Sequence, residues 1–270
     1  MLSVASERSS AGDPARTLNL LWRSSAAVSR RGPERGLDVD AVVAAATDLA
    51  DREGLEAVTM RRVAAALGVG AMTLYTYVPG KAELLDLMLD SAYARMSRAD
   101  TTGQPWRQRL ITIAEENRAL FDAHPWAATV STLRPPLGPG LISKYEHELS
   151  ALEGLGLDDV EMDDCLSHLL TFVQASARAV ADARAARTSS AMDDEQWWAS
   201  NAPLLARVLD ERAYPLATRV GTAAGAAHRS AHDPAHTYRF GLHRVLDGLA
   251  TLIDNRRVPP DTAGTQDRQE

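Results

Sequence analysis

The sequence is poor in cysteine and in long apolar runs. Its one cysteine among 270 residues is Cys165, so a disulfide framework is excluded. Cys165 lies within a helical pattern, where we expect a small buried residue instead of a nucleophile or a metal ligand. No stretch of eighteen apolar residues is free of charge, and the N-terminus lacks the apolar core of a signal peptide. These absences predict a cytoplasmic protein that contacts no membrane.

The sequence also has few of the segments that form β-strands. It contains only three phenylalanines, and no segment alternates apolar with polar residues for long. Alanine and leucine are abundant instead. A chain of this length can hold one small and one larger domain, each with a buried core. We therefore predict an all-α protein with two domains.

Charge is unevenly distributed along the chain. The net charge of −7 by itself argues against nucleic-acid binding, but residues 1–36 carry an excess of arginine. This segment is also rich in serine, alanine and glycine, and we predict a flexible basic arm. The arm is either solvated or lies along DNA, on phosphates or in the minor groove. For the second case the best candidates are the arginines closest to the first expected helix: Arg30, Arg31 and Arg35.

Residues 37–98 are predicted to form a small domain of three helices followed by a linking helix. Apolar residues recur at helical spacing over 38–54, and Thr59 is placed to cap a second helix that Gly68 ends. A third helix is expected over 70–77. Two helices joined by a short glycine turn form the layout of the helix-turn-helix motif of DNA-binding proteins. Structural αα-corners share this layout, so the spacing alone leaves both interpretations open.

The side chains of the third helix favour DNA binding. Leu74 and Val78 fall on one face, which we expect to be the core face. The rest of the helix carries hydroxyl and methyl groups that can contact phosphate oxygens, base edges or thymine methyls. Basic residues precede and follow it. The predicted DNA-binding residues are Thr59, Arg61, Arg62, Ala71, Met72, Thr73, Tyr75, Thr76, Tyr77 and Lys81.

The remainder of the chain is also predicted to be helical, with prolines and glycines at the breaks. Further helices are expected near residues 105–123, 126–133, 139–154, 158–187, 193–212 and 234–254, with a disordered tail over 257–270. The last of these helices has an apolar stripe that must pack against another surface. Its members are Leu242, Val245, Leu246, Leu249, Leu252 and Ile253.

Three histidines raise the question of a metal site. His228, His232 and His236 recur every four residues, and on one helix they would align as zinc ligands. Gly221 and Gly225 precede them, which favours a loop with exposed histidines. No Ser-His-Asp or Cys-His arrangement is evident elsewhere. We therefore predict neither an enzyme nor a metal or cofactor site.

The motifs of the small domain resemble the TetR family of bacterial transcriptional regulators. The run GLEAVTMRRVAAALGV begins at Gly54, TLYTYV begins at Thr73, and Lys81 opens a K-x-E-L-L motif. The resemblance covers about residues 38–98 in sequence, and the later helical plan is similar to the tetracycline-repressor-like C-terminal domain. It implies that DNA is contacted by Arg61, Thr73, Tyr75, Tyr77 and Lys81. Ala71 and Met72 replace a glutamine and a proline of the tetracycline repressor, so that protein's operator cannot be transferred.

The resemblance also implies an architecture and a function. Residues 99–256 would form a helical ligand-binding and dimerisation domain, and a homodimer would bind a palindromic DNA operator until a small-molecule inducer releases it. The candidate inducer contacts are Asn117, Phe121, Trp126, His147, Phe172 and Gln174, each also explicable as core or surface. The apolar stripe of the last helix would pair with helix 158–187 across a two-fold axis. The alternative is a helical small-molecule-binding or scaffold protein without DNA binding.

Overall fold

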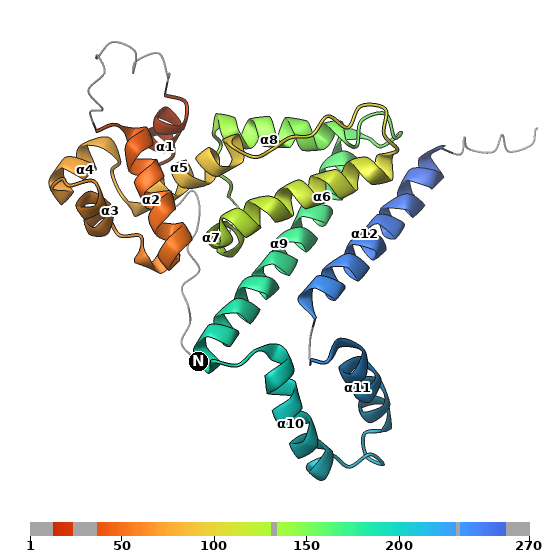
Figure 1. Ribbon diagram of the computed structural model, residues 1–270. Coiled ribbons are helices and arrows are strands. Elements are labelled where there is room, and N and C mark those ends of the chain that lie inside the picture. The colour runs from red at the N-terminus through yellow and green to blue at the C-terminus, as the bar shows by residue number, and fades with distance from the viewer. Residues whose placement is uncertain (1–12, 24–36, 131–133, 231–232, 258–270) are drawn as a thin grey trace, which may run out of the picture.

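The computed structural model describes residues 13–23, 37–130, 134–230 and 233–257. Within these ranges every regular element is a helix, which confirms the all-α prediction. A small N-terminal domain lies at the left of Figure 1, and a larger domain of long helices extends from it. None of the helices described has both the length and the apolar character that a membrane span requires.

The small domain is built from short helices around one core. Its elements are α2 (Val39–Glu53), the 3-10 turn η2 (Leu55–Ala57), α3 (Met60–Ala66), α4 (Ala71–Tyr77) and the start of α5 (Lys81–Ala94). Asp38 begins α2, because its carboxylate accepts a hydrogen bond from the backbone N–H of Ala41 at 2.7 Å. The core side chains include Val42, Ala46, Val63, Leu74, Val78 and Leu84. The predicted core face of the third helix is thus confirmed.

Helix α5 connects the two domains through buried contacts. It runs against α8 (Pro139–Ser150) and ends four residues before the expected boundary. The carboxylate of Asp90, on α5, accepts a hydrogen bond from the backbone N–H of Leu141 at 2.8 Å. Burial raises the pKa of Asp90, although the backbone hydrogen bonds from Leu141 and Gly140 oppose the shift. The linking helix is therefore anchored in the larger domain by a buried polar contact.

The larger domain has its core between three helices. These are α6 (Trp106–Ala123), α9 (Asp159–Ser190) and α12 (Pro234–Arg257), and α7 (Pro125–Thr129) follows α6. A capping box fixes the start of α9, where Asp158 and Glu161 each bond the other's backbone N–H. Figure 1 shows α9 and α12 side by side. Cys165 lies buried in this core, as expected. The core also contains Leu110, Ile113, Leu166, Leu169, Leu246 and Ile253.

A helical hairpin projects from the end of α9, where part of the chain was expected to form a loop. It consists of α10 (Asp194–Val208) and α11 (Pro215–His228), shown at the bottom of Figure 1. The loop prediction for the stretch with Gly221, Gly225 and the histidines is wrong over α11, which Pro215 begins and whose interior contains both glycines. Gly225 is needed there, because a Cβ would lie 2.8 Å from the indole of Trp198 on α10. Close packing, and not a turn, explains this glycine.

The segment predicted as a flexible arm contains a helix. Asp13 caps α1 (Pro14–Leu21), which packs on α5 and buries Leu21. The indole N–H of Trp22 then donates a hydrogen bond to the carbonyl of Leu137 at 2.8 Å. The prediction of an arm without structure is therefore corrected over 14–21, where the apolar residues of LNLLW find a surface to cover. Arg30, Arg31, Arg35 and the tail beyond residue 257 lie outside the described residues.

Two glycines in helices give opposite predictions for alanine substitution. A Cβ at Gly140 would overlap the backbone carbonyl of Asp90, so we expect Gly140→Ala to lower the free energy of unfolding by about 1–3 kcal/mol. Gly221, on α11, has no atom within 4 Å of its added Cβ. Gly221→Ala should raise the free energy of unfolding by up to about 1 kcal/mol through helix propensity. Urea denaturation of both variants measures this, and a neutral Gly140→Ala would show that α5 and α8 separate easily.

Candidate functional site

The helix-turn-helix is formed by α3, a tight turn and α4. The Thr59 hydroxyl accepts a hydrogen bond from the backbone N–H of Arg62 at 3.3 Å, which confirms it as the cap of α3. Gly68 then adopts a left-handed backbone with φ of 68°, and the N–H of Val69 closes the turn on the carbonyl of Ala64 at 3.0 Å. Helix α4 follows after Gly70. The glycine permits the turn that sets the angle between the two helices.

One face of α4 points away from the rest of the chain. Leu74 is fully buried beneath the helix, whereas Met72 is 78% exposed and Tyr75 is 42% exposed. Thr73 and Thr76 are exposed as well. The Thr76 hydroxyl donates to the carbonyl of Thr73 at 2.6 Å, so its methyl group is the part that remains for contact. In Figure 1, α3 and α4 lie at the outer end of the small domain, distant from α9 and α12.

Ala71 and Tyr77 are less exposed than the other predicted DNA contacts of α4. Both are partly buried and pack against the core of the small domain, so neither projects fully outward. The helix is short, and its first and last residues lie close to the body that supports it. We infer that these two residues anchor α4 on the small domain and contribute only part of their surface to the exposed face.

Basic residues flank this face on both sides. Arg61 and Arg62 are exposed on α3, and Lys81 is the first residue of α5. A guanidinium nitrogen of Arg62 lies 2.7 Å from a carboxylate oxygen of Glu53. Both side chains of this pair are about half exposed, so solvent screens the pair and Arg62 can exchange it for a phosphate at little cost.

A cavity of about 400 Å³ lies in the larger domain. Residues of α6, α9 and the start of α12 line it, as does Pro125 at the start of α7. Much of the wall is apolar and consists of two aromatic rings and several small or branched aliphatic side chains. These residues are Phe121, Val173, Ala177, Val180, Ala181 and Tyr238.

The polar part of the cavity wall is a network centred on Glu115. One carboxylate oxygen of Glu115 accepts a hydrogen bond from the Tyr238 hydroxyl at 3.0 Å, and the other accepts from Nε of Arg118 at 2.7 Å. The Arg118 guanidinium lies 5.4 Å from the centre of the Tyr238 ring. Burial, with the nearby Glu115 charge, raises the pKa of Tyr238. Tyr238 is therefore a neutral hydrogen-bond donor.

The structure does not bring the six predicted ligand contacts together. Phe121 lines the cavity. Asn117 is buried outside it and donates to Glu148 on α8 at 2.6 Å. A ring nitrogen of His147 lies 2.8 Å from Glu116, in the surface between α6 and α8. Glu115 and Arg118 line the cavity but were not among the predicted contacts. Their spacing of three residues on one helix was the sequence signal that could have identified them as a pair.

Trp126, Gln174 and Phe172 also lie outside the cavity lining, next to it. The indole N–H of Trp126 donates to a carboxylate oxygen of Asp51, on α2, at 2.7 Å, and Nδ1 of His124 lies 2.8 Å from the same oxygen. Gln174 donates to backbone carbonyls at the end of α7, at 3.2 and 3.3 Å. Phe172 stacks on the cavity tyrosine with ring centres 5.9 Å apart. The contacts of Trp126 and Gln174 hold α7 between α9 and the small domain.

The apolar stripe of α12 is mostly covered within one chain. Four of its six members, Leu242, Leu246, Leu249 and Ile253, are buried against α9 and α6. The expectation that the whole stripe faces a second copy is therefore corrected, because α9 and α12 pair inside a single chain. Val245 and Leu252 are only partly buried and stay candidates for a contact between copies.

The histidines do not share one helix. His228 ends α11 and His236 lies in the first turn of α12, with ring centres 4.7 Å apart. His232 lies outside the described residues. In the described ranges, no group of three or more histidine, cysteine, aspartate or glutamate side chains is arranged to hold a metal ion.

An outward recognition helix at one end and a helical domain with an inner cavity at the other define a ligand-responsive DNA-binding regulator. The family model described as "Bacterial regulatory proteins, tetR family" matches residues 42–88. The model described as "Tetracyclin repressor-like, C-terminal domain" matches residues 99–253. The chain belongs to the TetR family of transcriptional regulators. This confirms the predictions of the family, of a regulator and of a protein that is not an enzyme.

Relatives and solved structures agree with this membership. The HTH-type transcriptional repressor DrrR1 of Streptomyces coeruleorubidus is 40% identical over 254 residues, covering 94% of this chain and 92% of that protein. The repressor Rv1353c of Mycobacterium tuberculosis is 25% identical over 83% of this chain and 85% of that protein. The crystal structure of ActR from Streptomyces coelicolor in complex with actinorhodin has a TM-score of 0.67 and 27% identity, over 80% of this chain and 97% of that one.

Proposed function

We propose that the chain represses transcription as a homodimer, which binds a palindromic operator through α4 of each copy and leaves it when a small molecule occupies the cavity. The observation that carries this proposal is the outward face of α4, with Met72, Thr73 and Tyr75 exposed above a buried Leu74. Similarity to DrrR1 supports repression as the sign of regulation. A scaffold or carrier without DNA binding would leave this face without a role.

The proposed DNA contacts divide by chemistry. Met72, Thr73 and the Thr76 methyl group are placed to contact base edges in the major groove, where they would read sequence. The Tyr75 hydroxyl and the ammonium group of Lys81 are suited to phosphate oxygens, as are the exposed guanidinium groups of α3. These phosphate contacts would position α4 without reading sequence.

A second copy is proposed because the α10–α11 hairpin lacks cover in one chain. Helix α10 has no buried residue, yet the hairpin exposes large apolar side chains. Such a surface is typical of a contact with another protein. The exposed residues are Trp197, Leu204, Leu205, Val208, Leu216 and Val220. A homodimer would cover them and would present two α4 helices to DNA.

The contacts of Asp51 supply a direct route from the cavity to the DNA-binding domain. Pro125 lines the cavity, and its neighbours His124 and Trp126 both hold the Asp51 carboxylate on α2. A ligand that displaces the start of α7 therefore displaces α2 as well. Release follows if the ligand binds more tightly to the arrangement in which the two α4 helices no longer match the operator.

Selection of binding sites from random duplex DNA tests the proposal. We expect the unmodified protein to enrich a palindrome whose half-sites lie about one helical turn apart, roughly 34–36 Å. Tyr75→Ala and Lys81→Ala should each abolish the enrichment, and light scattering should give the mass of two chains. If no sequence is enriched even at low salt, the helix-turn-helix is a structural corner. If the enriched site is a single half-site bound by a monomer, the dimer is wrong.

A further inference from the structure

We propose, resting on the proposed function, that the cavity takes a flat, apolar molecule that carries one anionic group, such as a carboxylate. The apolar body would lie along α9, and the anion would meet Arg239 at the start of α12. The shape and charge of the cavity wall carry this inference.

The apolar wall is suited to a flat ring system. Ala177 and Ala181 lie on successive turns of α9 and line the cavity, so their small side chains leave a shallow surface along the helix. The rings of Phe121 and Tyr238 line the cavity from α6 and α12. Aromatic faces with small aliphatic neighbours favour planar apolar ligands. A volume of about 400 Å³ lies within the range of small-molecule sites.

The charged wall is suited to an anion. Three arginines and two carboxylates line the cavity, and both carboxylates already have cationic partners. Glu115 is bonded to Arg118, and a carboxylate oxygen of Asp122 lies 3.4 Å from a guanidinium nitrogen of Arg184. Of the lining cations, Arg239 is left with no carboxylate within 4 Å among the described residues. A ligand carboxylate would supply the missing partner.

Two features near Arg239 define its electrostatic surroundings. The carboxylate of Asp233 precedes α12 and accepts a hydrogen bond from the backbone N–H of His236 at 3.0 Å, so it caps the helix. This backbone hydrogen bond and, to a smaller extent, the Arg239 charge lower the pKa of Asp233. The first residues of α12, Pro234 and Ala235, also line the cavity, so the positive end of a 24-residue helix faces the same space. The Asp233 carboxylate offsets the positive end of the helix, so the Arg239 guanidinium is the group of this wall that favours a negative ligand.

Three fluorescent probes of one shape test the charge preference. Anthracene-2-carboxylate, its neutral carboxamide and the cationic 2-(aminomethyl)anthracene differ mainly in charge. We expect the full-length protein to bind the carboxylate about three- to fivefold more tightly than the carboxamide, because an ion pair with the exposed Arg239, partly screened by solvent, adds to the shared apolar contact. The cationic probe should bind most weakly. Titrations followed by fluorescence anisotropy give the three dissociation constants.

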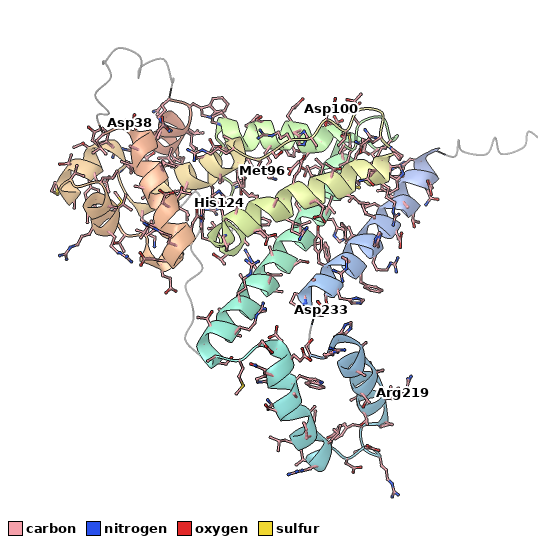
Figure 2. The ribbon with its side chains drawn as sticks, in the orientation of Figure 1. Asp38, Met96, Asp100, His124, Arg219 and Asp233 are labelled. Atoms are coloured by element: carbon pink, nitrogen blue, oxygen red, sulfur yellow. The ribbon has the colours of Figure 1, made fainter. Side chains whose placement is uncertain are left out.

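Matched variants separate Arg239 from general effects of charge. In Arg239→Gln the preference for the carboxylate should fall to within about twofold, while the affinity for the carboxamide stays unchanged. Arg219→Gln is the control, since Arg219 is exposed on α11, far from the cavity (Figure 2). It should keep the full preference.

Three outcomes would overturn the inference. They are equal affinity for acid and amide in the unmodified protein, an acid preference that survives Arg239→Gln, and failure of all three probes to bind. Operator binding measured on the same preparation identifies which proposal has failed. A protein that binds its operator but shows any of these results keeps the proposed regulator function and loses only this ligand class.

Discussion

Met72→Glu should weaken binding to the selected operator by roughly 100-fold, or about 2–3 kcal/mol, because it brings a carboxylate against the DNA phosphates. Met72 is the most exposed large apolar side chain of α4 and has no role in the core of the small domain. The free energy of unfolding should therefore stay within about 0.5 kcal/mol of the unmodified protein. Electrophoretic mobility shift at fixed salt measures the affinity, and urea denaturation measures the stability.

The control for this substitution adds the same charge elsewhere. Val160 is 69% exposed near the start of α9, in the larger domain. Val160→Glu changes the net charge by the same amount as Met72→Glu. If the position on the α4 face matters and the net charge does not, the operator affinity of Val160→Glu should stay within about twofold of the unmodified protein. Equal losses in both variants would mean that the effect is general repulsion. An unchanged affinity in Met72→Glu would remove α4 from the DNA interface.

Lys144→Met should lower the free energy of unfolding by about 3–5 kcal/mol, since it leaves a buried carboxylate without its cation. The Lys144 ammonium lies 2.7 Å from both carboxylate oxygens of Glu148, and both side chains are almost fully buried. The same ammonium lies 5.5 Å from the centre of the Tyr93 ring on α5. The pair thus stands where the linking helix meets α8. Urea denaturation gives the change in stability.

Two further variants test the cause of that loss. Lys144→Met combined with Glu148→Leu removes both charges, so a large part of the stability should return, although the buried Asn117 amide loses one of its two acceptors. Arg244→Met breaks the Arg244–Asp247 pair, whose side chains are about half exposed, and should cost less than about 1 kcal/mol. A small loss in Lys144→Met, similar to that of Arg244→Met, would show that water reaches Glu148. Failure of the double variant to recover would implicate packing or the lost Asn117–Glu148 hydrogen bond instead of the unpaired charge.

The helix-turn-helix could be predicted from sequence because its determinants are local. Thr59 caps α3, Gly68 ends it, and Leu74 and Val78 form the buried face of α4. Each of these signals acts within a few residues along the chain, where backbone geometry determines which side chains share a face. The partial burial of Ala71 and Tyr77 could not be predicted in this way, because the body beneath the ends of α4 is a tertiary feature.

Contacts between helices were not predictable in the same way. The cavity combines Arg118 on α6, Ala177 on α9 and Arg239 on α12, and only the packing angle of three helices decides that these side chains meet. Most of the predicted ligand residues instead make contacts outside the cavity, as Trp126 does with Asp51. The pairing of α12 with α9 within one chain likewise depends on which apolar face lies nearest.

The sequence by itself determined that the chain is helical, where the recognition helix lies and to which family it belongs. Periodicity, caps and glycine turns act over one or two turns of a helix, and a short stretch of chain is enough to express them. Only the tertiary structure decided that α1 and α11 are ordered, that the α12 stripe is internal, and which charges face the cavity. Those outcomes depend on the burial of apolar surface against residues distant in sequence. The free energy gained from this burial is available only when the chain has folded.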